Sequence, residues 1–250
     1  MEEQREAAPQ STMPFMDKVV NVFAAPGELY ENVRSTPKTT SNWLVPAIVL
    51  ICVSIVLSQV MLTNASLNDQ IGQATRKAME QAVQQGRITQ EQADQQIERI
   101  GPGSVIFTIG TTVGPLIFTF LRLFLIALVL WLLGKSAMKA QAPYMKVVEV
   151  VGLTLFISVL EAIVTTILAF AMDSITATPS LGAFVSNFDF GNKMHMALAK
   201  VNIFTFWIIA VTSIGLSKLF QRDLPKVLVL VVALWIIWAV VSLFTGLNFG

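Results

Sequence analysis

Long apolar runs separated by short polar segments dominate the chain. A membrane-spanning helix needs roughly 20 mostly apolar residues, and five stretches reach that length. The second run is long enough to contain a tilt or a kink at Gly114-Pro115. The pattern predicts an all-α membrane protein, a bundle of five transmembrane helices within residues 44–250. The expected spans are about 44–63, 105–133, 147–172, 201–220 and 227–244.

The segment before the first run, residues 13–43, predicts amphipathic helices at the cytoplasmic face. Pro26 ends one apolar stripe and can begin a second helix at its first turn. Two arrangements are equally compatible with this pattern. The helices lie on the inner membrane surface, or they dock on the cytoplasmic ends of the bundle. Residues 1–12 are expected to be a disordered tail. The two stripes comprise Phe15, Val19, Val22 and Phe23, then Leu29, Tyr30 and Val33.

The insertion between the first two spans, residues 64–103, is polar and rich in glutamine. Small apolar residues recur at helical spacing, and Gly86 interrupts them. Thr89 has the position of an N-cap, with Gln92 completing a capping box. The segment therefore predicts an extracytoplasmic helical hairpin. Its apolar face is mostly alanine, which favours a small cap over the bundle rather than a partner surface.

Composition fixes the class of protein. The 250 residues are 54% hydrophobic and only 13% charged, with a net charge of +1. Soluble domains are about 25% charged, so a bilayer is the expected surrounding. The charge balance gives no sign of nucleic-acid binding. The single cysteine, Cys52, lies inside an apolar run. The acidic, polar N-terminus does not read as a signal peptide, which makes the first span an uncleaved anchor.

Lysine and arginine in short loops indicate the orientation. The loops after the second and fourth spans carry most of the unbalanced basic residues, and they lie on the same side as the N-terminal region. We therefore expect a cytoplasmic N-terminus and an extracytoplasmic C-terminus. The basic residues of those two loops are Lys135, Lys139, Lys146, Lys218, Arg222 and Lys226.

The chain lacks the common catalytic and cofactor motifs. His195 is the only histidine, which excludes a Ser-His-Asp triad or a two-histidine metal site within one chain. Met194-His195-Met196 offers soft ligands suited to Cu(I), but an interfacial histidine is the more ordinary interpretation. No catalytic residue, cofactor or metal site is predicted.

Arg122 and Glu161 are charges inside apolar runs. Isolated charges at bilayer depth cost from ~3 to more than ~10 kcal/mol, so both must face protein, water or a headgroup. The depths are measured from the cytoplasmic end that the second and third spans share. Arg122 lies about 12 residues from Gly134 and Glu161 about 14 from Val147, which gives depths of roughly 18 and 21 Å. The two are predicted to be level and to form an intramembrane ion pair. A pin between two helices is favoured over a proton or ion relay.

Three stretches resemble the Yip domain family, named for eukaryotic proteins that interact with Ypt/Rab GTPases. They are VFAAPGELYENVR, WLLGKSAMKAQAPYMKVVEVVGLTLFISVLEAIV and VNIFTFWIIAVTSIGLSKLFQRDLPKVLVLVVALWIIW. The short N-terminal region and the polar insertion are similar to the prokaryotic branch, for which a Rab-type GTPase is not expected as a partner. The matching positions are Phe23, Pro26, Tyr30, Gly134, Lys135, Phe204, Trp207, Gly215, Leu216 and Lys218.

The resemblance implies a five-helix membrane protein with a cytoplasmic N-terminus. The expected function is that of a non-enzymatic scaffold in the bacterial plasma membrane, which organises or bends the membrane or binds another protein. Its expected partners are the lipid bilayer and a second copy or another membrane protein. The alternative is a small-molecule or ion transporter that uses the Arg122–Glu161 pair. A membrane enzyme is third.

Overall fold

The computed structural model describes residues 12–245, so the predicted tail at residues 1–12 and the C-terminal residues 246–250 lie almost wholly outside the described range. Within that range the chain is helical and contains no named strand. Five helices are long and apolar enough to cross a membrane. The prediction of an all-α protein with five membrane-length helices is confirmed. These helices are α3 (Ser41–Thr63), α6 (Val105–Ala137), α7 (Tyr144–Ala171), α9 (Ile203–Phe220) and α10 (Leu224–Thr245).

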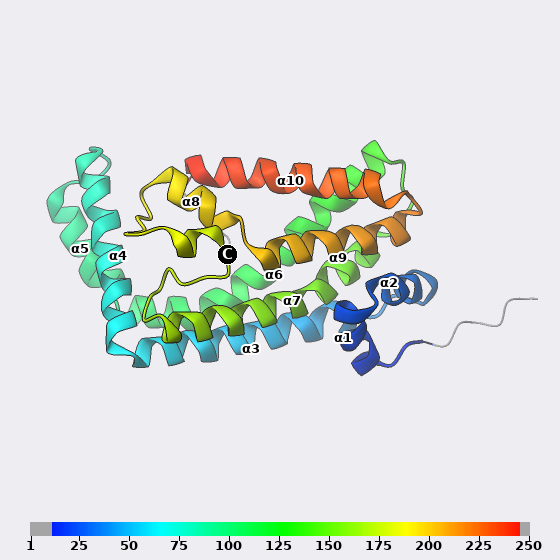
Figure 1. The fold of residues 1–250 in the computed structure, drawn as a ribbon, viewed down its shortest axis with the longest axis horizontal. Coiled ribbons are helices and arrows are strands. Elements are labelled where there is room, and N and C mark those ends of the chain that lie inside the picture. The colour runs from blue at the N-terminus through cyan, green and yellow to red at the C-terminus, as the bar shows by residue number, and fades with distance from the viewer. Residues whose placement is uncertain (1–11, 246–250) are drawn as a thin grey trace, which may run out of the picture.

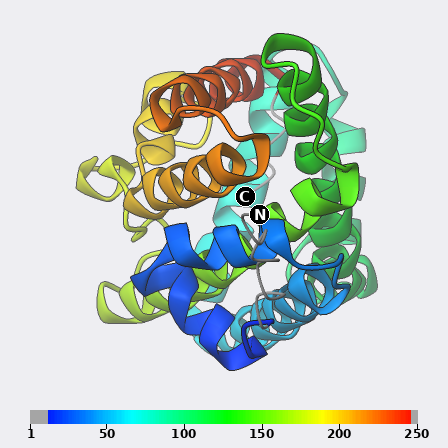
Figure 2. The ribbon, with the colours of Figure 1, turned by 90° about the vertical axis from the view of Figure 1, so that its right-hand side faces the viewer.

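Helix α7 is the centre of the bundle and packs against α3, α6 and α9 (Figure 1). Its contact with α3 is the most extensive between any two helices, because Gly152 lets the backbone at Trp43 approach closely. Helix α10 packs mainly against α9. The end view in Figure 2 shows α10 at the top with the end of α6 beside it, and α9 below them. The hydrophobic core therefore follows α7, and most residues of α3, α6 and α10 are at least partly exposed.

Two short helices precede the bundle, α1 (Phe15–Ala24) and α2 (Pro26–Ser35). Pro26 stands at the first position of α2, where the missing N–H is not needed. Helix α1 packs against α7, and α2 packs against α9 and α7. We call this the α1–α2 end of the bundle.

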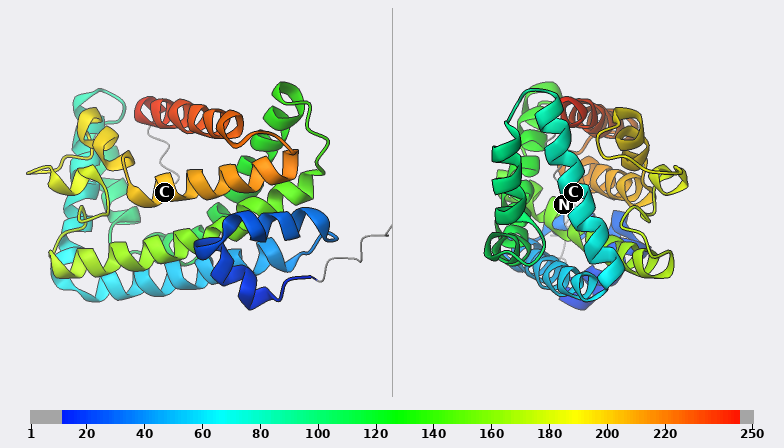
Figure 3. Two further views of the ribbon diagram at one scale, coloured as in Figure 1. Left: turned by 45° about the vertical axis from the view of Figure 1, so that its right-hand side comes forward. Right: turned by 90° about the vertical axis from the view of Figure 1, so that its left-hand side faces the viewer.

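Helices α4 (Ala65–Gln84) and α5 (Gln90–Ile100) form the opposite end, the α4–α5 end. Figure 3 shows α4 running crosswise over the ends of the long helices, with α5 outside it. Gln70 Nε2 donates to the carbonyl of Asp173, at 2.8 Å, which ties α4 to the end of α7. The capping box predicted at Thr89 and Gln92 is present at the start of α5. The remaining elements, a short 3₁₀ helix η1 (Leu181–Phe184) and α8 (Lys193–Lys200), lie between α7 and α9.

Candidate functional site

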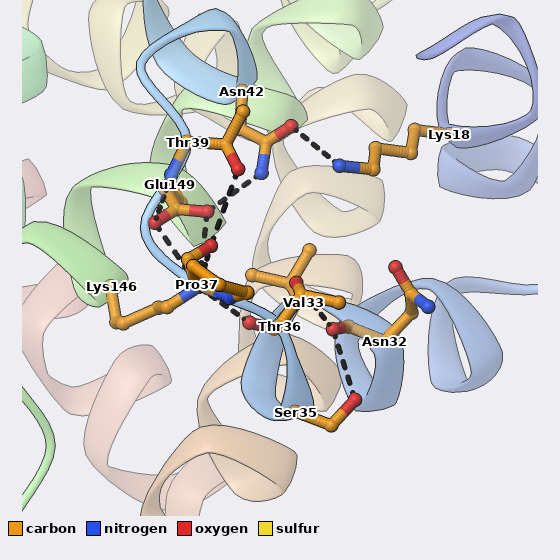
Figure 4. A network of polar contacts seen from close by, with 10 residues as sticks. All are labelled: Lys18, Asn32, Val33, Ser35, Thr36, Pro37, Thr39, Asn42, Lys146 and Glu149. Carbon is orange, nitrogen blue, oxygen red and sulfur yellow. Dashed lines mark hydrogen bonds and ion pairs between the residues drawn. The ribbon is translucent and has the colours of Figure 1, made fainter. Parts of the chain in front are cut away.

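Four charged or amide side chains meet inside the α1–α2 end (Figure 4). They come from three helices: Lys18 from α1, Asn42 from α3, and Lys146 and Glu149 from α7. Each is no more than 5% exposed. Polar groups that are buried this deeply are expected to be hydrogen-bonded, because an unpaired buried charge costs several kcal/mol, about 3 to 5 when one partner of a pair is lost. These four residues are called the buried polar network below.

The carboxylate of Glu149 is the centre of this network. It accepts a hydrogen bond from Asn42 Nδ2, at 2.6 Å, and another from the backbone N–H of Thr39, at 3.2 Å. Lys146 Nζ forms an ion pair with it, at 3.3 Å. Lys18 Nζ donates to Asn42 Oδ1, at 3.1 Å, so Asn42 joins α1 to the carboxylate. One acidic group therefore connects α1, α3 and α7.

Lys146 also holds the segment between α2 and α3. Its ammonium donates to the carbonyl oxygens of Val33, at 2.7 Å, and Pro37, at 3.1 Å. Val33 lies in the last turn of α2, where backbone carbonyls lack partners within the helix. Lys146, which the sequence places among the loop charges, is thus a buried cap for α2 and not an exposed surface cation.

The network holds two ammonium groups and one carboxylate. Burial lowers the pKa of Lys18, and the positive charge of Lys146 lowers it further, while the Glu149 carboxylate raises it. Burial also raises the pKa of Tyr30 well above its usual value. The arrangement contains no nucleophile with an adjacent base, and its chemistry is that of a clamp that fixes α1 and the α2–α3 segment.

The residues that resemble the Yip pattern meet beside this network. The rings of Phe23 and Trp207 are in edge-to-face contact with centroids 5.7 Å apart, and Phe204 stacks on Trp207 at 6.2 Å. Such pairs contribute about 0.5–1.5 kcal/mol beyond their buried area. The aromatic cluster joins the end of α1 to the first turns of α9.

Tyr30 and Gly215 form a close contact between α2 and α9. Tyr30 is 1% exposed, and its hydroxyl donates to the carbonyl of Val150, at 3.3 Å. A Cβ atom added at Gly215 would lie 3.0 Å from the Tyr30 ring and 2.6 Å from Val150. Only glycine leaves enough room here, and Leu216 beside it is fully buried.

The remaining motif positions lie at the rim of the same end. A Cβ atom at Gly134 would lie 2.5 Å from the ring of Phe220, so α6 and α9 meet closely at this point. The ammonium of Lys135 lies 5.1 Å above the ring of Trp131, in a cation–π contact. Lys218 is exposed and lines a surface pocket of about 360 Å³ together with Glu28 and Glu31 of α2.

Arg122 and Glu161 are not brought into direct contact. Within the described residues no ion pair within 4.0 Å joins them, although they interact electrostatically at longer range. Tyr144 at the start of α7 contacts α6 at two levels: its ring contacts that of Trp131, and its hydroxyl donates to the carbonyl of Phe124, at 3.0 Å. Arg122 is two residues from Phe124 and so lies close to the level of Tyr144. Glu161 lies 17 residues further along α7, about 26 Å at 1.5 Å per residue.

Glu161 has a different partner, Asn202. The Asn202 side chain donates to the Glu161 carboxylate, at 2.6 Å, and its carbonyl oxygen accepts from the N–H of Phe204, at 2.8 Å. Asn202 is the N-cap of α9. A carboxylate is favourable at a helix N-terminus because of the positive end of the helix dipole. Glu161 thus holds the start of α9, while Arg122 is exposed on α6.

The sequence interpretation missed Asn42, Glu149 and Asn202. A signal for Glu149 was present, since Lys146 and Glu149 are three residues apart at the start of an apolar run. No residue near Asn42 in the sequence indicates its role, because its carboxylate partner lies 107 residues away. His195 accepts a hydrogen bond at Nδ1 from the N–H of Asp189. Among residues 12–245 no three His, Cys, Asp or Glu side chains are grouped as metal ligands would be.

Comparison with known protein families identifies a match over most of the chain. The family model described as the Yip1 domain matches residues 20–246 of the chain. No curated protein and no solved structure matches it. The matched range includes Asn42, Lys146 and Glu149 of the buried polar network, but Lys18 lies outside it.

Proposed function

Because the chain belongs to the Yip1 domain family, we propose that it is a non-enzymatic membrane protein that organises or shapes the bilayer and serves as a scaffold for other membrane proteins. The observation that carries the proposal is the way α1 packs against the bundle. One side of this helix is fixed to the bundle through Lys18 and Phe15, and the other side presents apolar side chains to the surroundings.

The fixed side of α1 places the helix beside the bundle and not beneath it. The ring of Phe15 lies 6.3 Å from that of Phe156, about 18 Å along α7 from Tyr144. Lys18, three residues further on, donates to Asn42 in the buried polar network. Helix α1 thus has a set height and direction relative to the membrane-spanning helices.

The free side of α1 carries Met16 and Val20, one helical turn apart, which are 69% and 58% exposed. Asp17 is exposed beside them. An amphipathic helix held at this height would place both apolar side chains among lipid chains near the headgroups. This supports the interpretation of residues 13–43 as an interfacial region. A helix inserted in one leaflet displaces lipid on that side only, which is the physical basis for bending a membrane.

The orientation belongs to the same proposal. We place the α1–α2 end in the cytoplasm, the α4–α5 hairpin and the C-terminus outside it, and the protein in the plasma membrane of a bacterium, as a member of the prokaryotic branch. The basic residues of the two short loops at the α1–α2 end support this, following the preference for positive charge on the cytoplasmic side. Five of them are exposed: Lys135, Lys139, Lys218, Arg222 and Lys226.

Partners follow from this placement. The lipid bilayer is the first, and a second copy of the chain or another membrane protein is the second. A Rab-type GTPase is not among them for a prokaryotic member. The transporter alternative needs Arg122 and Glu161 to act together, whereas the carboxylate of Glu161 is hydrogen-bonded to Asn202. No observation therefore favours transport over the scaffold.

The experiment is reconstitution into vesicles, with vesicle shape recorded by electron microscopy. The double variant Met16→Ser/Val20→Ser removes the apolar stripe of α1, and Asp17→Ser changes the exposed residue between them as the control. We expect the native protein and Asp17→Ser to produce tubules or small vesicles and the double variant to leave vesicle shape unchanged. Equal vesicle shape with the native protein and the double variant would contradict the role of α1.

A further inference from the structure

The segment that connects α7 to α9 lies beside the ends of membrane-spanning helices. Helix α9 has 18 residues, or about 27 Å, while α7 has 28 and α10 has 22, or about 42 and 33 Å. A bilayer core is about 30 Å thick, so α9 is too short to cross it fully. Figures 1 and 3 show η1 and α8 filling the place between the start of α9 and the ends of α7 and α10.

Backbone hydrogen bonds fix η1 at the start of α9. The N–H of Leu181 donates to the carbonyl of Val201, at 3.0 Å, and the N–H of Ile203 donates to that of Pro179, at 3.2 Å. Helix α8 packs against η1 and α10. Its Lys193 places the ammonium 4.3 Å above the ring of Phe244, near the end of α10. The segment therefore has a fixed depth, level with the ends of two membrane helices.

Large apolar side chains project from this segment. Phe184 is 85% exposed, Met194 is 67% and Leu181 is 46%. Their exposure continues the apolar surface of the spanning helices, where Ile203 at the start of α9 and Phe244 near the end of α10 are 67% and 71% exposed. Leaving a Leu, Phe or Met side chain in water costs about 1.5–3 kcal/mol relative to burying it.

We propose that residues 181–194 form an interfacial anchor, which inserts Leu181, Phe184 and Met194 among the acyl chains of the leaflet at the α4–α5 end. Two polar groups of the segment have partners within the protein. The ammonium of Lys193 lies on an aromatic ring, and the Asp189 N–H is bonded to His195 Nδ1. The anchor completes the crossing that α9 begins and continues the lipid-facing surface of α9 and α10.

The test uses spin labels in the full chain, reconstituted in lipid bilayers. Cys52 is first replaced by serine, because it is the chain's one cysteine and is exposed. Single cysteines are then introduced by Phe184→Cys and Met194→Cys. Two matched positions calibrate the measurement: Ile237→Cys, on a residue of α10 that is 60% exposed, and Gln85→Cys, on an exposed residue after α4. Oxygen concentrates in hydrocarbon and a nickel chelate stays in water, so their relaxation effects distinguish the two surroundings.

We expect the labels at positions 184 and 194 to follow the label at 237, with high access to oxygen and low access to the chelate. Labels that follow position 85 would place the segment in water and overturn the proposal. Labels with low access to both reagents and with spin–spin broadening would show that a second copy covers the segment, which also overturns it. All four substituted side chains are exposed, and protein recovery in a single peak on size-exclusion chromatography checks that each variant is folded.

Discussion

Tyr30 of α2 packs its ring directly on the backbone of Gly215 in α9, at a distance that leaves no room for a side chain at that glycine. The two residues are 185 positions apart in the chain. Together with the hydrogen bond from Tyr30 to Val150, this contact sets how closely α2 approaches the membrane-spanning helices.

Replacing Gly215 by alanine is expected to loosen this contact. The added Cβ atom would lie 2.6 Å from Val150, and overpacking of this kind costs about 1–3 kcal/mol. The apparent unfolding temperature of the detergent-solubilised protein should fall. Gly110→Ala is the control, since nothing lies within 4 Å of a Cβ at Gly110 in α6. An equal response of the two variants would contradict the packing assigned to Gly215.

Removing the Glu149 carboxylate should destabilise the α1–α2 end more than any surface charge change. Glu149→Ala leaves the ammonium of Lys146 buried without an anion, and loss of one partner of a buried pair costs about 3–5 kcal/mol. The segment between α2 and α3 should become sensitive to limited proteolysis. Asp223→Ala breaks the exposed pair with Lys226 and should change little. Unchanged proteolysis in Glu149→Ala would show that the buried polar network does not hold the segment between α2 and α3.

The burial of Lys18 predicts that the stability of the protein depends on pH. Burial lowers the pKa of Lys18 in the folded protein below its usual 10.5. At a pH between the folded and the unfolded pKa, the unfolded chain therefore binds more protons than the folded one. Stability then rises with pH across that window. Lys18→Met should remove this rise, measured as the difference in unfolding temperature from the native protein between neutral pH and about 10.5. Lys135→Met, at an exposed position, should keep it. If the unfolding temperature of Lys18→Met changed with pH in parallel with that of the native protein, the role of Lys18 would be contradicted.

Glu161 should be coupled to Asn202 more strongly than to Arg122. A double-mutant cycle with Glu161→Ala and Asn202→Ala is expected to give a coupling energy of about 0.5–3 kcal/mol, because the two side chains are in contact at 2.6 Å. The cycle with Arg122→Ala should give about 0.5 kcal/mol or less, as for separated sites. Larger coupling to Arg122, or rescue of single charge reversals by the double reversal, would restore the direct pair.

Local signals in the sequence were sufficient for the long helices and for the helices before and between the first spans, but not for η1 and α8, which lie in a segment expected to be a loop. The apolar runs predict five long helices, Pro26 predicts the break between α1 and α2, and Thr89 with Gln92 predicts the start of α5. In each case the information lies within one or two helical turns. The docking of α1 and α2 was left open, because periodicity identifies an apolar face without identifying what covers it.

The site was harder to predict because its partners are distant in sequence. Lys146 looks like a loop cation until Glu149, Val33 and Pro37 are seen around it. The depth count for Arg122 assumed that α6 and α7 share a level at Gly134 and Val147. The contacts of Tyr144 with Trp131 and Phe124 set another register, in which Glu161 lies nearer the start of α9. A helix length gives depth only when the level of its neighbour is known.

The contact between Tyr30 and Gly215 also orders events during synthesis. Helix α2 is made early, but its glycine partner follows only after another 185 residues. At about 5–20 residues per second, that interval is roughly 10 to 40 s. Throughout it, the N-terminal helices have no completed site on the bundle, and three further membrane helices must be inserted first. Docking of α2 therefore has to wait for α9, and a ribosome-bound intermediate that ends before α9 should expose Tyr30 to chemical modification.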